Sequence, residues 1–218
     1  MRTILLLLLV PLACAEEVSV DQLFNTAVRE QQKGQYSDAI RDYREIIQRR
    51  PDMVEAKVNL GATLADSGQY EDAIAIYKAA LPSVSLKKPV LMNIARAYYM
   101  KGDLERARQQ LAEVHQLYPE DQEVTVRLAN VDLEAHAPAE SVALLQPLDS
   151  GNSQNTDFQY LYGTALIASG HPEQGVPRVE QVARAANRAD AYIFWREARI
   201  CDTDTPMRLA MTWRPRFA

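Results

Sequence analysis

Side chains that commonly perform chemistry are few in this chain, and they are scattered along it. The chain contains three histidines: His115, His136 and His171. None of them has a second histidine at the spacing of a metal site, so we interpret all three as solvated or capping residues. Adjacent acids such as Glu71-Asp72 and Glu120-Asp121 stand where helices are expected to begin, and there carboxylates complement the helix dipole.

Sequence motifs that mark known catalytic or cofactor sites are missing as well. The chain has no glycine-rich phosphate loop, no His-Glu-x-x-His, no Cys-x-x-Cys and no Gly-x-Ser-x-Gly. Cys201 has no second cysteine to pair with if Cys14 is removed with a leader, and we read it as a small hydrophobe. We therefore expect no catalytic residues, no cofactor and no metal, and we do not expect an enzyme.

Composition points to an elongated helical protein with a negative charge. Of the 218 residues, 47% are hydrophobic, 24% are charged, and the formal net charge is -5. Few glycines among many Ala, Leu, Glu, Gln and Arg residues favour helix. Duplex nucleic acid is disfavoured as a partner because binding its phosphates needs clustered basic residues. The pairs Arg49-Arg50 and Lys87-Lys88 are expected to be charges at helix ends, since cations favour helix C-termini.

The chain contains a sequence repeat, and the elements of this repeat must position any functional site. Four glycines lie on one 34-residue grid, and His136 occupies the vacant fourth slot: Gly34, Gly68, Gly102 and Gly170. Seven residues before each slot stands a small residue: Ala27, Gly61, Ala95, Ala129 and Gly163. Another small residue follows five after each slot: Ala39, Ala73, Ala107, Ser141 and Gly175. Such a period marks a repeat architecture, and small residues at two fixed places let paired helices approach closely.

Four positions after this second small residue stands a larger one: Tyr43, Tyr77, Leu111, Leu145 and Val179. With this pattern, the chain resembles the tetratricopeptide repeat family over residues 20–188. The resemblance implies an all-α fold, a right-handed α-solenoid of about five helix-turn-helix repeats. The expected units are about 20–53, 54–87, 88–121, 122–155 and 156–189. A capping helix at 190–200 would cover the open end, and residues 201–218 are expected to form an irregular tail.

The N-terminus has the pattern of an export signal. Met1-Arg2 is followed by an apolar run, and Ala13-Cys14-Ala15 fits a cleavage site, so residues 1–15 are expected to be a signal peptide. Leu12-Ala13-Cys14 also resembles the end of a bacterial lipoprotein signal, which leaves a lipid anchor at Cys14 as the alternative. We expect a periplasmic or secreted protein without a membrane span.

In the family, the first helices of successive repeats line a concave groove. The resemblance implies that this groove binds a partner through apolar, aromatic and polar residues: Val58, Met92, Arg96, Tyr99, Met100, Val126, Asn130, Leu133 and Tyr160. Chaperone-binding members hold a C-terminal carboxylate with a set of Lys, Asn and Arg residues. Only Asn59 matches that set, because Phe24, Val28, Pro89 and Asn93 stand at the other positions.

We therefore expect an exported scaffold that binds a protein or peptide segment in its groove. Two alternatives remain open at this point: an outer-membrane lipoprotein that assists assembly, and a non-catalytic accessory subunit of an exported enzyme.

Overall fold

The computed structural model describes residues 18–186. The expected signal peptide at 1–15 with Cys14, the capping helix at 190–200 and the tail at 201–218 lie outside the described residues. Within 18–186 the chain forms ten α-helices and no strand: α1 (Val20–Gln32), α2 (Tyr36–Arg49), α3 (Val54–Asp66), α4 (Tyr70–Ala80), α5 (Lys87–Lys101), α6 (Leu104–Leu117), α7 (Gln122–Glu134), α8 (Pro138–Leu145), α9 (Thr156–Ala168) and α10 (Pro172–Ala186). Short 3-10 turns lie at Leu81–Ser83, Gln146–Leu148 and Ser150–Asn152.

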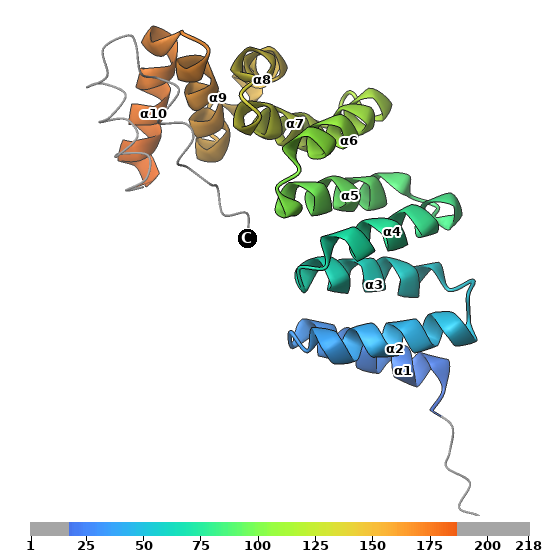
Figure 1. Cartoon of the computed structure of the whole chain (residues 1–218). Coiled ribbons are helices and arrows are strands. Elements are labelled where there is room, and N and C mark those ends of the chain that lie inside the picture. The colour runs from blue at the N-terminus through green and yellow to red at the C-terminus, as the bar shows by residue number, and fades with distance from the viewer. Residues whose placement is uncertain (1–17, 187–218) are drawn as a thin grey trace, which may run out of the picture.

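The helices are arranged as consecutive pairs. Each helix packs mainly on its neighbours in the chain, and α1 also contacts α3, α3 contacts α5, and α7 contacts α9. Figure 1 shows the pairs following one another in chain order along an elongated, curved array. The prediction of an all-α solenoid of helix pairs is confirmed for the described residues. No helix between residues 18 and 186 combines the length and the apolar character that crossing a membrane requires.

The turn inside each pair uses a left-handed residue. Positive φ angles occur at the five grid positions: Gly34 (73°), Gly68 (83°), Gly102 (85°), His136 (62°) and Gly170 (89°). The next residue donates its backbone N–H to a carbonyl five positions earlier, as from Gln35 to Glu30 and from Gln69 to Leu64. This bond closes the first helix of each pair. His136 adopts the same conformation with a Cβ, which costs about 1–2 kcal/mol relative to glycine.

The small residues on either side of the turns lie where the two helices of a pair cross. Ala27, Ala39, Ala73 and Ala107 are each 0% exposed. At Gly61 a Cβ would stand only 2.7 Å from the ring of Tyr77, so α3 lies directly against the side chain that fills the pair. The expected fillers are buried as well: Tyr43, Tyr77, Leu111, Leu145 and Val179. The register predicted from the repeat is therefore confirmed at the helix crossings.

Ala73 and Ala75 on α4 provide a matched test of this packing. Ala73→Leu is expected to destabilise the protein by about 1–3 kcal/mol, because extra methylenes at a closed crossing force the helices apart. Ala75 is exposed on the same helix, and Ala75→Leu should change stability little. Urea unfolding of the two variants beside the parent chain measures the difference. Equal stabilities for Ala73→Leu and Ala75→Leu would contradict the crossing geometry.

Candidate protein-interaction surface

The predicted groove residues come from four first helices. Val58 lies on α3, Met92 to Met100 on α5, Val126 to Leu133 on α7, and Tyr160 on α9. Contacts between α3 and α5, and a hydrogen bond from α5 to α7, bring three of these helices side by side. We call their shared surface the first-helix face, defined by Val58, Met92, Arg96, Tyr99, Met100, Val126, Asn130 and Leu133.

The apolar part of the first-helix face is partly used in packing and partly open. Met100 is 51% exposed, the largest opening among its apolar side chains. Val58, Met92 and Tyr99 are half-buried against the N-terminal core, and Val126 and Leu133 against the core of the following pairs. These side chains therefore support neighbouring helices and still leave part of their surface to solvent.

Tyr160 does not lie on an open surface, contrary to our expectation for its position. It is 2% exposed and packs with Val179 and Val182 of α10. The physical reason is that α9 is enclosed on several sides, since every residue from Phe158 to Ile167 is buried. Tyr160 is therefore left out of the first-helix face.

The polar residues of the face form two separate groups. The Tyr99 hydroxyl donates to Glu134 Oε1 at 2.7 Å, and the Asn130 amide donates to the same oxygen at 3.0 Å. Asn130 is itself buried, so it acts by orienting Glu134. Arg96 lies apart from this group, with its guanidinium 3.5 Å from Asp66 on α3. Repeat positions alone gave no sign of the bond between Tyr99 and Glu134.

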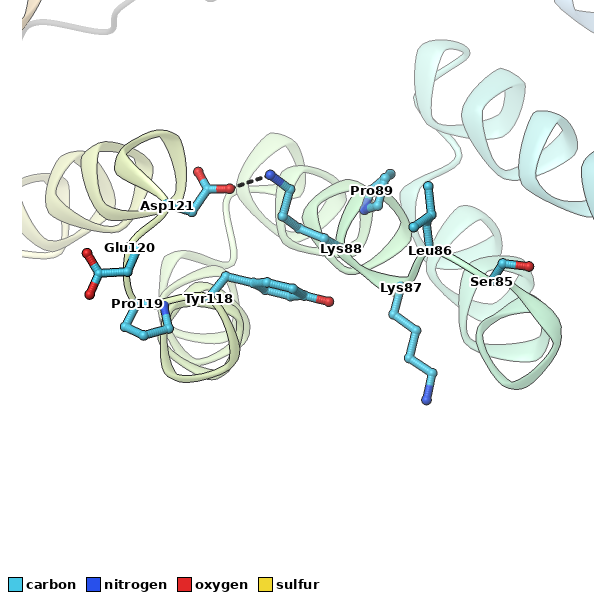
Figure 2. Close-up of a pocket in the computed structure, with 9 residues that line it drawn as sticks. All are labelled: Ser85, Leu86, Lys87, Lys88, Pro89, Tyr118, Pro119, Glu120 and Asp121. Carbon is cyan, nitrogen blue, oxygen red and sulfur yellow. Dashed lines mark hydrogen bonds and ion pairs between the residues drawn. The ribbon is translucent and has the colours of Figure 1, made fainter.

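A hollow of about 690 Å³ lies outside the first-helix face, between the loop before α5 and the loop before α7. Its lining is mainly apolar and is formed by Ser85, Leu86, Lys87, Lys88, Pro89, Tyr118, Pro119, Glu120 and Asp121. Figure 2 shows these residues, with the Tyr118 ring extending toward the start of α5. Repeat positions gave no sign of this hollow, although Pro89 and Pro119 both line it.

The expected position of Lys87 and Lys88 was wrong. We expected them near a helix C-terminus, where cations are favoured, but they begin α5. Lys88 instead forms an ion pair with Asp121, which caps α7 by accepting from the backbone of Glu123 and Val124. The hydrogen bond from Lys88 is the main reason that the pKa of Asp121 lies below its usual value. The pair thus joins the starts of two successive first helices.

No histidine in the described part of the chain belongs to a metal cluster, and residues 18–186 hold no group of three potential ligands. His136 and His171 are exposed in turns. His115 lies with its Nδ1 3.2 Å from the Thr125 hydroxyl, which ties the end of α6 to α7.

Comparison with protein families matches residues 24–86, and again residues 90–121, to the tetratricopeptide repeat. The CTR9 homolog of Arabidopsis thaliana is 27% identical over 118 residues, which is 54% of this chain and 10% of that protein. The chain therefore spans about a tenth of the length of this relative.

Solved structures of the same architecture cover most of the chain. MamA from residue 41 to its end, from Desulfovibrio magneticus RS-1, has a TM-score of 0.68 at 14% identity, covering 78% of this chain and 97% of that one. YrrB, described as a repeat protein with an unusual peptide-binding site, has a TM-score of 0.66 at 11% identity, covering 82% and 92%. At these identities the likeness establishes the fold alone.

An ion pair between the partly exposed Arg108 and the buried Asp132 links α6 to α7. Arg108 Nε donates to Asp132 Oδ1 at 2.6 Å, and the Asp132 side chain is only 4% exposed. Burial raises the pKa of Asp132 above its usual value, while the bond from Arg108 opposes that rise. The carboxylate therefore depends on Arg108 for its charge compensation.

We expect Arg108→Met to destabilise the protein by about 1–3 kcal/mol at pH 7, because it leaves a buried carboxylate uncompensated. A raised pKa in the folded state means that the fold binds this proton more tightly than the unfolded chain does. The loss relative to the parent chain should therefore shrink as the pH falls through the folded pKa of Asp132. Urea unfolding at pH 7 and pH 4.5 measures this loss of stability.

Arg127→Met, which breaks the exposed pair with Glu123, is the control and should lose little stability at either pH. Equal losses of stability for Arg108→Met at the two pH values would contradict the role of Arg108 in compensating the charge of Asp132.

Proposed function

Since the chain is a tetratricopeptide repeat protein, we propose that it is an exported scaffold that binds a protein or peptide segment on its first-helix face. Arrays of this kind generally act as non-catalytic scaffolds that present an extended surface to a partner. YrrB, which has a similar architecture, is described as having an unusual peptide-binding site, and this supports a binding role for the present chain.

The observation that carries the proposal is the exposure of Met100 among other apolar side chains. Met100 is 51% exposed, and Met92, Tyr99 and Leu133 each leave part of their surface open nearby. An open apolar strip is costly to leave in water and typically marks a partner surface. Methionine suits such a surface, because its flexible side chain adapts to the shape of a bound segment.

The binding site can be tested by photo-crosslinking in the cells that naturally make the protein. A photoreactive side chain at Met100 is expected to give a discrete adduct with one partner, whereas one at the exposed Glu113 of α6 should not. In addition, Met100→Ala should lower partner capture about tenfold or more, because truncating a central anchor costs about 2 kcal/mol. The melting temperature of this variant should fall little, because Met100 is 51% exposed. Adducts from Glu113 alone would move the site to the second helices.

Export is part of the proposal and has its own test. The basic start, apolar run and small residues at Ala13 and Ala15 support cleavage before Glu16. Intact-mass measurement on the protein from the cell envelope or medium is expected to find Glu16 as the first residue. A chain that begins at a lipid-modified Cys14 would establish the lipoprotein alternative, and a full-length cytoplasmic product would contradict export.

A further inference from the structure

Three residues occupy the same position in successive repeats, at the ends of three first helices. Asp66 closes α3, Met100 lies one residue before the end of α5, and Glu134 closes α7. Because α3 contacts α5 and Tyr99 bonds to Glu134, the exposed Met100 lies on the helix between the two that carry the carboxylates. Acidic groups therefore stand on both sides of the most open apolar side chain of the face.

The Glu134 carboxylate is held by two hydrogen-bond donors that carry no charge. Both bonds from Tyr99 and Asn130 end on Oε1, which fixes the carboxylate and leaves Oε2 unused by these two donors. Within residues 18–186, no Lys or Arg nitrogen forms an ion pair with Glu134. The hydrogen bonds from Tyr99 and Asn130 hold the Glu134 carboxylate in one place, so the binding of a ligand would not have to restrict the motion of this side chain.

Asp66 is only weakly neutralised. Its partner Arg96 lies 3.5 Å away, and the Arg96 side chain is 59% exposed. Such an exposed, long ion pair contributes little and can be exchanged for another cation. The charge of Asp66 is therefore also accessible to a ligand that carries a basic group.

Acids also begin most of the first helices, although α5 begins with Lys87 and Lys88, and Glu123 pairs with Arg127. The first turns of α1, α3, α7 and α9 each contain an acid: Asp21, Glu55, Glu123 and Asp157. Among the residues that define the face, Arg96 is the one cation. A ligand that runs across the C-terminal ends of α3, α5 and α7 therefore meets Asp66 on one side of Met100 and Glu134 on the other.

We infer that the segment bound on the first-helix face is basic and amphipathic, with an apolar side chain over Met100 and Lys or Arg residues that pair with Glu134 and Asp66. The inference rests on the proposed function and adds the chemical class of the partner. Opposite charges across an interface favour the right partner and repel acidic ones. The apolar contact supplies affinity, and the flanking carboxylates select which apolar segments can bind.

The experiment uses the purified full chain and three short synthetic peptides with the same leucines. The remaining positions are Lys in the first peptide, Gln in the second and Glu in the third. Fluorescence anisotropy is expected to rank Lys above Gln by about tenfold or more, with the Glu peptide weakest and the Lys peptide weakened by added salt.

Two isosteric variants identify the carboxylates responsible. Glu134→Gln keeps the oxygen that Tyr99 and Asn130 bond and removes only the charge, so it should weaken the Lys peptide about tenfold and leave the Gln peptide unchanged. Asp66→Asn should act in the same direction. Glu113→Gln, an exposed acid on α6, is the control for non-specific attraction to an acidic protein and should have no effect.

The outcomes separate this inference from the proposed function. Equal binding of the Lys and Gln peptides, preference for the Glu peptide, no binding of the Lys peptide, or equal losses in Glu113→Gln and Glu134→Gln would each overturn the basic partner. Crosslinking from Met100 does not use these peptides. An adduct from Met100 together with any of those results would leave the scaffold function standing and reject only the charge of its partner.

Discussion

Close contact between the two helices of each pair is the constraint on which the rest of the structure depends. It requires small residues at two places per repeat, such as Ala27 with Ala39 and Gly61 with Ala73, and a large side chain beside them. With the pair closed in this way, its remaining apolar surface can be buried only against the next pair. The array is thus built by neighbour contacts, and each first helix comes to lie near the next first helix.

This construction explains how a surface can be both structural and available to a partner. Met92, Tyr99 and Leu133 lie on first helices and contact the cores with part of their surface, and the rest of each side chain remains exposed. Polar contacts fix the relative position of these helices. Glu134 is held by Tyr99 from α5 and by Asn130 from its own helix, while Arg108 compensates Asp132 below. A rigid face of this kind loses little conformational entropy when it binds.

The proposed preference for a basic, amphipathic segment follows from the same rigidity. Charges on mobile side chains contribute little to binding, whereas a carboxylate held by two donors is already placed for its ligand. The hollow between the α5 and α7 loops differs in this respect. Its cation Lys88 and its acid Asp121 satisfy each other, and that pair serves to join two helix starts.

The sequence by itself determined the repeat, the turn positions and the residues at the helix crossings, because each depends on local backbone geometry and side-chain size at fixed spacing. It also predicted that Met92, Arg96, Tyr99 and Met100 of α5 face a groove. Only the tertiary structure decided which of them are open. Tyr160 fills an equivalent position and is buried, since α10 packs over it, and Arg96 turns to Asp66 rather than to Glu134. Such outcomes depend on distances between helices that lie a full repeat apart, and the order of residues along the chain does not contain those distances.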